Sequence, residues 1–540
     1  MALARTHAIA LVGVQGHVVE IEADIENGLV TLLLVGLPDT ALREARDRIR
    51  SAIVNSKQPW PQRRITVGLS PASLPKRGSG FDVGIAVAIL AAAGSALASA
   101  VADTVFLGEL GLDGRLRQVP GVLPSVAAAA AAGFRRVVVP QENMPEAALV
   151  PGMRIVAPAN LAALLAWLRR KRTASQDRQV LVVDSGDGLT SSPERGVGDV
   201  ADTRRRTAPA QPGLARSATS PMRDLADVAG QPVARRAAEI CAAGGHHLML
   251  LGPPGVGKTL LAERLPTIMP GLGPAEALEV SAIHSVAGAL TPDRPLVTEP
   301  PFCAPHHTAT KAAIVGGGSG MIRPGAASLA HLGCLFLDEA PEFDRDVLDA
   351  LRQPLESGEV VLARSGVTAR FPARFTLLLA ANPCPCARMS GSGADCTCSP
   401  LARRRYLARL SGPLLDRVDV KVQLLPVSRA ELLCDLRLAE SSATVAARVV
   451  QARERAARRL RGTGWRLNAE IPGGELRRKF RPDQAALAPL ERAMDLGQIS
   501  ARGADRIIRL SWTLADLAGA DRPGLAEVGY ALGLWLGVGQ

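Results

Sequence analysis

Aromatic residues are scarce in this chain of 540 residues, where Phe, Trp and Tyr together make up 3%. This composition argues against recognition of nucleic acid by a platform of stacked aromatic side chains. Cysteine is sparse as well, with 8 residues, and four of these cluster at Cys384, Cys386, Cys396 and Cys398. Clustering of this kind favours a metal site in a reducing compartment over the disulfide framework of a secreted protein.

A convincing targeting signal and a membrane-spanning segment are lacking too. Residues 1–13 carry one arginine and a short apolar run, without the small-residue cleavage site of a signal peptide. The most apolar window, Val83–Ala102, has the length to span a membrane. Ala, Gly and Ser dominate that window, however, and they contribute little to insertion. We therefore expect a buried helix there, and a cytoplasmic protein without a membrane partner.

The residues that are abundant indicate a large globular protein. Hydrophobic residues make up 47% of the chain, and its length predicts about three or four domains, each with its own core. The formal net charge is +12. An excess of this size favours a polyanionic partner such as DNA, and it is equally typical of a solvated surface in an arginine-rich protein.

Four stretches of the chain differ in their patterning. Apolar and acidic residues alternate over 19–26, as in a strand with one buried face, and further strand and helix patterns predict a mixed α/β domain over 1–168. Many Ser, Thr, Gly and Pro residues and basic clusters predict a flexible linker over 169–222, which the short apolar run Val180–Val183 interrupts. Strands that alternate with helices indicate a parallel sheet over 223–426, and helical patterns alone follow over 427–540.

An apolar run at 248–251 leads into a glycine-rich segment with the spacing Gly-x-x-x-x-Gly-Lys-Thr of a P-loop. Its glycines let backbone N–H groups and the next helix N-terminus approach phosphate oxygens. We predict that Lys258 reaches the β and γ phosphates of ATP and that the Thr259 hydroxyl binds Mg²⁺. The expected nucleotide-binding residues are Gly252, Pro253, Pro254, Gly255, Val256, Gly257, Lys258, Thr259 and Leu260.

Polar side chains follow two later apolar runs. Asp338 and Glu339 come directly after Cys334–Leu337, and we expect Asp338 to hold the Mg²⁺ shell and Glu339 to activate the attacking water. Asn382 follows Phe375–Ala381, a position from which an amide can help to hold that water beside the γ-phosphate. The simpler interpretations are an acidic helix cap for the first pair and a turn before proline for Asn382.

Three arginines are candidates for contact with a phosphoryl group. Arg417 lies between acidic residues at the predicted edge of the α/β domain, and an arginine supplied across a subunit interface can stabilise charge on a transferred phosphoryl group. Arg502 opens a C-terminal helix that also holds Arg506. A surface salt bridge is the simpler interpretation for each of them.

In combination, these motifs resemble the Mg-chelatase-like family of AAA+ ATPases, the group that includes YifB and ComM. The resemblance covers nearly the whole chain apart from 169–222, and it also rests on the motifs Ala304–Thr308, Val315–Gly318, Leu351–Gly358, Ala381–Cys386 and Ser411–Arg417. It implies an AAA+ core with a parallel sheet, a C-terminal helical lid and assembly into a hexameric ring. By the resemblance, Asn382 is sensor 1, Arg417 is the arginine finger for the neighbouring subunit's nucleotide, and Arg502 is sensor 2, with Arg506 as the alternative.

The first domain resembles the Lon-protease-like domain of the same family, an α/β fold of the ribosomal-protein-S5-like type. The matching motifs are 36–39, 74–82 and 107–114. A Lon-type protease pairs a serine nucleophile with a lysine base, but Gly80 stands at the serine position and Ser125 at the lysine position. Ser79 is one place off and has no obvious basic partner. We therefore expect a domain without proteolytic activity.

The clustered cysteines read Cys-Pro-Cys, nine residues, then Cys-Thr-Cys. Four soft ligands on one loop suit tetrahedral Zn²⁺ in a structural site. Reduced free thiols and an oxidisable pair are the alternatives.

Two further motifs leave their roles open. For His306 and His307, a structural or pore-loop role is favoured over metal binding, since no third ligand is evident. The stretch Gly358–Phe371 resembles the β-hairpin that this clade inserts before sensor 1. In ring motors such hairpins face the channel, so Arg364 and Arg370 are candidates for contact with a phosphate backbone, and a hairpin without cargo contact is an equal alternative.

The function expected from the resemblance and the basic charge is that of an ATP-driven ring motor on single-stranded or branched DNA. Branch migration or helicase activity in recombination or natural transformation fits this expectation. The first alternative is a chelatase-type ATP-dependent remodeller that assists metal insertion into a tetrapyrrole, and a second is a nucleotide-switched scaffold. The presence of Glu339 and Arg417 weakens the scaffold interpretation because turnover needs both groups.

Overall fold

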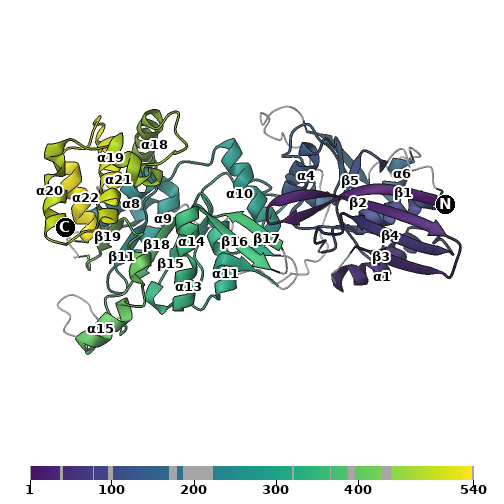
Figure 1. Cartoon of the computed structure of the whole chain (residues 1–540), viewed down its shortest axis with the longest axis horizontal. Coiled ribbons are helices and arrows are strands. Elements are labelled where there is room, and N and C mark those ends of the chain that lie inside the picture. The colour runs from purple at the N-terminus through teal and green to yellow at the C-terminus, as the bar shows by residue number, and fades with distance from the viewer. Residues whose placement is uncertain are drawn as a thin grey trace.

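The computed structural model describes ten stretches of the chain, namely residues 2–36, 40–76, 78–94, 101–169, 179–185, 223–318, 322–364, 367–386, 396–427 and 439–537. The molecule is elongated (Figure 1). The N-terminal α/β domain lies at one end, the nucleotide-binding sheet in the middle and the C-terminal helices at the other end. The predicted α/β multidomain class is confirmed.

The N-terminal domain is built on an eight-stranded sheet of order β10-β9-β8-β5-β1-β2-β4-β3. Neighbouring residues of its strands, such as Val105 and Phe106, belong to two separate apolar clusters, because successive side chains point to opposite faces. Helices α1, α2 and α6 cover one face, and α4 and α5 cover the other. The strands are β1 (Ala2–Val12), β2 (Gln15–Glu26), β3 (Thr31–Val35), β4 (Arg64–Ser70), β5 (Thr104–Phe106), β8 (Arg136–Val138), β9 (Arg154–Pro158) and β10 (Val180–Asp184). The helices are α1 (Thr40–Asn55), α2 (Asp82–Ala92), α4 (Val122–Ala131), α5 (Met144–Ala147) and α6 (Leu161–Leu168).

Two segments for which the sequence predicts no strand add strands to this sheet. Residues 2–12, which contain the short apolar run near the N-terminus, form the long strand β1, which pairs with β2 along its whole length. Within the stretch 169–222, which was predicted to be a linker, Val180–Asp184 forms β10 and pairs with β9. The rest of that stretch lies mostly outside the described residues.

The apolar window Val83–Ala102 begins inside α2, and every residue of that helix is buried. Packing of α2 against β1 and β2 explains why it is apolar all round. Among the described helices, none combines the length and the apolar character needed to cross a bilayer.

The central sheet has five parallel strands in the order β12-β15-β18-β11-β19. Both of its faces are buried at β11, β15 and β18, because alternate residues of these strands join two different apolar clusters, as is typical of parallel sheets. The strands are β11 (Leu248–Leu251), β12 (Phe302–Cys303), β15 (Cys334–Leu337), β18 (Thr376–Ala381) and β19 (Val420–Gln423). Helices α8 (Pro232–Gly244) and α9 (Lys258–Ile268) pack on one face, and α13 (Arg345–Ala350) lies on the other.

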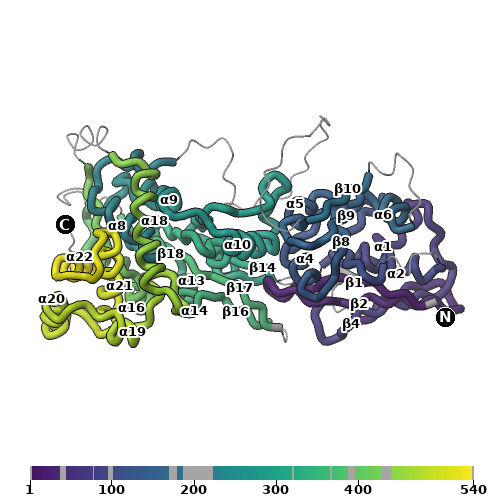
Figure 2. The backbone as a smooth tube through the Cα atoms, turned by 90° about the horizontal axis from the view of Figure 1, so that it is seen from above, coloured from purple at the N-terminus to yellow at the C-terminus, as the bar shows by residue number. Residues whose placement is uncertain are grey.

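The described part of the C-terminal region, residues 439–537, contains helices and turns and no strand. Helices α18 and α21 pack against α8, so the lid shares one apolar core with the central sheet (Figure 2). Serine side chains cap both helices, Ser441 for α18 and Ser500 for α21. The helices are α18 (Ser442–Arg459), α19 (Gly473–Arg478), α20 (Gln484–Asp495), α21 (Ala501–Ala518) and α22 (Leu525–Leu536).

A β-hairpin of β16 (Glu359–Arg364) and β17 (Val367–Pro372) lies between the central sheet and the N-terminal domain. Its residues Ala369 and Phe371 share an apolar cluster with Leu11 of β1. A second contact comes from α10 (Pro274–Ala287), where the Ser285 hydroxyl donates to the buried Glu146 carboxylate at 2.7 Å. One face of the hairpin is therefore held by the N-terminal domain, while Arg364 and Arg370 remain exposed.

Candidate nucleotide site

The P-loop connects the carboxyl end of β11 to the first turn of α9. Gly255 and Gly257 adopt φ values of +80° and +94°, which favour glycine for conformational reasons. Gly252 is required for a different reason, since a Cβ there would lie 2.7 Å from the Leu424 carbonyl oxygen. The loop thus needs glycine at each of these three positions to keep its backbone shape.

Lys258 is buried in the P-loop, with 8% of the residue exposed. Its ammonium group donates to the carbonyl oxygens of Gly252 at 2.6 Å and Pro253 at 2.8 Å. It also donates to the Asn382 Oδ1 atom at 2.9 Å. Burial lowers the pKa of Lys258 from its usual range, and the carboxylates of Asp338 and Glu339 act in the opposite direction. The predicted phosphate-binding lysine and the predicted sensor 1 amide are therefore in direct contact.

Thr259 and Asp338 form the oxygen-rich side of the site. The Thr259 hydroxyl donates to Asp338 Oδ2 at 2.6 Å, and Asp338 Oδ1 accepts the Glu339 backbone N–H at 2.9 Å. The two residues meet because β11 and β15 are parallel and both end at this edge of the sheet. A hydroxyl and a carboxylate in contact are hard oxygen donors that fit Mg²⁺.

Glu339 occupies an unusual backbone conformation at this edge. Its φ of +50° lies in the left-handed region, which is uncommon for a residue other than glycine. Its carboxylate Oε2 lies 3.4 Å from Nδ1 of His307. The His307 ring is packed against His306, with ring centroids 4.1 Å apart. The sequence offered the two histidines without a partner, and the structure places one of them beside the predicted catalytic carboxylate.

Arg417 lies at the opposite edge of the central sheet. Leu248 of β11 is paired with Val420 of β19 in a parallel register, so Arg417 precedes β19 while the P-loop follows β11. Four residues of strand separate the two edges by about 13 Å. Arg417 therefore lies across the sheet from the P-loop of its own chain. Its guanidinium contacts the Glu356 carboxylate and the Pro413 carbonyl oxygen.

The two other candidate arginines lie at this same amino edge. Arg506 donates to the Arg417 carbonyl oxygen at 2.9 Å and to Asp419 Oδ1 at 2.6 Å. Arg502, one turn earlier on α21, is exposed. The structure thus groups Arg417, Arg502 and Arg506 together and does not bring Arg502 or Arg506 to the P-loop of the same chain.

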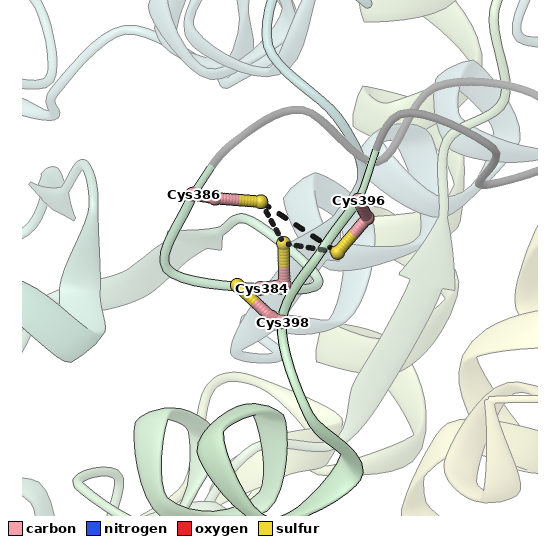
Figure 3. A group of neighbouring side chains, drawn as sticks. All are labelled: Cys384, Cys386, Cys396 and Cys398. Carbon is pink, nitrogen blue, oxygen red and sulfur yellow. Dashed lines mark hydrogen bonds between the residues drawn. The ribbon is translucent and has the colours of Figure 1, made fainter.

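The four clustered cysteines converge on one point (Figure 3). Their Sγ atoms all lie within 4.8 Å of one another. The Cys384 sulfur lies 3.0 Å from that of Cys386 and 3.3 Å from that of Cys396. Cys384 comes two residues after Asn382, so the cysteine loop begins where the nucleotide site ends. Residues 387–395 lie outside the described chain.

In the N-terminal domain, the positions of a Lon-type serine and lysine line a cavity of about 470 Å³. Gly80 and Ser125 both contribute to its wall. The Ser79 hydroxyl donates to the Glu109 carboxylate, and the Ser125 hydroxyl donates to the Gly121 carbonyl oxygen at 2.7 Å. The serines described at this cavity are therefore paired with a carboxylate and a carbonyl group instead of a lysine.

A P-loop on a five-stranded parallel sheet, with an acidic pair and an asparagine at the same edge and a helical lid behind it, defines a P-loop ATPase of the AAA+ class. The chain belongs to the Mg-chelatase-like YifB/ComM family. Its residues 224–432 match the family "Magnesium chelatase, subunit ChlI", residues 21–143 match "Subunit ChlI of Mg-chelatase", and residues 439–534 match the C-terminal domain of that subunit.

Full-length relatives agree with this assignment. Protein Rv2897c of Mycobacterium tuberculosis is 50% identical over 532 residues, which cover 98% of each chain. YifB of Escherichia coli is 38% identical over 522 residues, covering 96% of this chain and 94% of the relative. The competence protein ComM of Haemophilus influenzae is 38% identical over 535 residues, covering 98% and 97%. The family resemblance inferred from the motifs is confirmed.

Proposed function

We propose that this protein hydrolyses ATP at a site shared between two subunits of a ring and uses the energy to move on DNA. The contact set of Lys258, Thr259, Asp338 and Asn382 at one edge of the sheet carries the proposal of hydrolysis. The position of Arg417 at the opposite edge supports the shared site, because that arginine can stabilise a γ-phosphate only in an adjacent subunit. A hexamer is the ring that the family resemblance implies.

Each residue of the site has a defined task in this proposal. On nucleotide binding, Lys258 exchanges the carbonyl oxygens of its own loop for phosphate oxygens, which are stronger acceptors for an ammonium group. Thr259 and Asp338 would hold Mg²⁺, which would neutralise charge on the phosphates. Glu339 leaves His307 and takes a proton from the attacking water, and Asn382 holds that water in line.

Exposed arginines and the family relationship support DNA as the cargo. Arg364 and Arg370 are exposed on the hairpin. Arg404 and Arg405 are exposed on α15 (Pro400–Leu407), which projects from the nucleotide-binding domain (Figure 1). Similarity to the competence protein ComM extends over 98% of this chain, whereas that to the 38 kDa magnesium-chelatase subunit of Rhodobacter capsulatus covers 32%. The DNA motor is therefore favoured over the chelatase-type remodeller.

ATP hydrolysis measured with and without single-stranded or branched DNA at low salt tests this proposal. We expect DNA to raise the turnover rate, and we expect Glu339→Gln to bind ATP without turnover because the base is missing. Replacing both Arg404 and Arg405 with alanine is expected to weaken DNA binding and to lower the salt slope by about two, since each arginine releases roughly one counterion.

The matched control removes the same charge from another face through Arg458→Ala and Arg461→Ala. These residues are exposed at the end of α18 and just beyond it, and their loss should leave DNA binding unchanged. A wild-type protein that neither binds DNA nor hydrolyses ATP faster in its presence at low salt would contradict the DNA-motor proposal.

We also propose that Cys384, Cys386, Cys396 and Cys398 hold one structural Zn²⁺. In a tetrahedral site with Zn–S bonds of about 2.3 Å, sulfur atoms are roughly 3.8 Å apart. The sulfur atoms of Cys384, Cys386 and Cys396, at 3.0, 3.3 and 3.6 Å from one another, need only a small expansion to reach that spacing. The ion would join the two ends of a loop that begins two residues after Asn382. Zinc binding would thereby stabilise the position of the sensor 1 side chain.

Metal analysis of reduced protein is expected to find one zinc per chain. Cys396→Ser should lower the zinc content and the thermal stability because three ligands and a water bind the ion more weakly than four thiolates. Cys303→Ser changes a buried cysteine on β12, outside the cluster, and should keep the zinc. Reduced wild-type protein with no stoichiometric zinc and no uptake on titration would contradict this site.

A further inference from the structure

The amino edge of the central sheet carries a concentration of positive charge around Arg417. Arg506 bonds to the Arg417 backbone, and Arg502 lies one turn before it on α21. Arg352 lies one turn before Glu356 on α14 (Arg352–Ser357). The Glu356 carboxylate contacts the Arg417 guanidinium. Burial lowers the pKa of Arg417, and the charges of Arg352, Arg506 and Arg502 lower it further. We refer to these four residues, Arg352, Arg417, Arg502 and Arg506, as the arginine cluster.

Two carboxylates contact the arginine cluster within the described residues, and their environments differ. The Asp419 side chain is 3% exposed. Its carboxylate accepts a hydrogen bond from the Arg506 guanidinium at 2.6 Å and another from the His247 backbone N–H at 3.1 Å. Both of these partners are themselves partly buried. Glu356 has 65% of its side chain exposed, while its partner Arg417 has 10% exposed. Of the two carboxylates, Glu356 can therefore leave its arginine partner and become hydrated at the lower cost in free energy.

Arg417 keeps unused hydrogen-bonding capacity in this arrangement. Its Nε atom is buried without a hydrogen-bond partner, and a guanidinium can donate through five N–H groups. A buried donor without a partner is unfavourable. Glu356 thus holds the Arg417 side chain but does not accept from all of its N–H groups. This is expected of an arginine that binds a larger anion in another state of the protein.

We propose that Glu356 is a placeholder for the neighbouring subunit's γ-phosphate: it holds Arg417 in the free subunit and gives it up when the ring forms. This inference rests on the proposed shared ATP site. A γ-phosphate carries more charge and more acceptor oxygens than a carboxylate and can satisfy several N–H groups of the cluster at once. Glu356 acts through Arg417 and is a positioning residue, not a catalytic one.

Removing the Glu356 charge has two effects that act in the same direction. Arg417 no longer has to break an ion pair before it meets the phosphate. The arginine cluster also loses a neutralising charge, which increases the repulsion among its guanidinium groups and hence their affinity for an anion. Ring formation with nucleotide is therefore expected at a lower protein concentration in Glu356→Gln than in wild type.

The experiment measures two quantities against protein concentration for the full-length chain: ring assembly by sedimentation velocity with a non-hydrolysable ATP analogue, and ATP turnover. In Glu356→Gln, both half-maximal concentrations should fall about two- to fivefold, the range expected for a largely exposed ion pair. The maximal turnover rate per subunit should stay at the wild-type value. Glu356→Asp retains the charge and should lie nearer to wild type, and Glu454→Gln removes an exposed carboxylate of α18 as the matched control.

A variant in which Arg417 is already absent gives the decisive comparison. In the Arg417→Ala background, Glu356→Gln should shift the assembly midpoint much less than in the wild-type background, because the ion pair is already gone and only the charge effect on the other three arginines remains. An unchanged midpoint for Glu356→Gln in the wild-type background, or a fall in its maximal turnover rate, would overturn the placeholder role. Absence of turnover in the wild type at every protein concentration would instead overturn the proposed ATP hydrolysis.

Discussion

Replacing Arg417 with alanine is expected to lower ATP turnover by about a thousandfold or more, the effect of losing an arginine finger in other phosphoryl-transfer sites. Nucleotide binding should persist, since Lys258, Thr259 and Asp338 lie at the other edge of the sheet and keep their contacts. Binding of a fluorescent ATP analogue and steady-state hydrolysis measure the two quantities separately. Arg345→Ala, which removes an exposed arginine of α13, is the matched control and should behave as wild type.

A mixing experiment tests whether Arg417 acts on the neighbouring subunit. Arg417→Ala and Glu339→Gln should each be inactive alone. Mixed in equal amounts, they should recover activity at about a quarter of the interfaces, because one subunit in two supplies each intact group to a head-to-tail contact. A mixture that stays inactive although mixed rings form, or full activity in isolated wild-type monomers, would contradict the shared site.

Replacing Lys258 with alanine is expected to abolish detectable ATP binding at micromolar protein and to lower turnover by about a hundredfold or more, because the γ-phosphate loses a charge-assisted hydrogen bond inside a buried site. The fold should persist. Lys258 donates to carbonyl oxygens of its own loop and to Asn382, and none of these contacts joins separate domains. Isothermal titration calorimetry and a thermal melt measure the two properties.

Lys479→Ala is the matched control for that variant, since Lys479 is an exposed lysine at the end of α19. It should bind and hydrolyse ATP as the wild type does. Retained ATP affinity in Lys258→Ala would contradict the assignment of the P-loop lysine. Loss of the cooperative melt would show that the side chain is needed for folding and would separate that role from phosphate binding.

The sequence was most informative where the chemistry is local. The P-loop spacing places phosphate-binding groups within eight consecutive residues, so no long-range contact is needed to recognise it. The apolar runs before Asp338 and Asn382 predicted strands, and parallel strands bring their carboxyl ends to one edge. Strand β10 could not be predicted with the same ease. Val180–Asp184 is a short apolar run, and its strand conformation depends on pairing with β9, which is a contact of the tertiary structure.

The partners of the candidate catalytic side chains could not be read from the sequence. His307 and Glu339 are separated by 32 positions, and Glu356 and Arg417 by 61, yet each pair is in contact. Adjacent histidines gave no sign of which carboxylate they would meet. Glu356 lies in a motif that identified the family, but its local pattern is only that of an exposed helix residue.

By itself, the sequence determined that this protein binds a nucleotide, belongs to an AAA+ lineage and carries four cysteines clustered in one short stretch. Each of these properties rests on short motifs whose residues are close together in the chain. Only the tertiary structure decided that Arg417, Arg502 and Arg506 lie at the edge of the sheet opposite the P-loop. It also decided that the Glu356 carboxylate contacts the Arg417 guanidinium. The physical reason is the parallel pairing of β11 with β19. Arg417 precedes β19 and the P-loop follows β11, so the two lie at opposite edges of the same sheet.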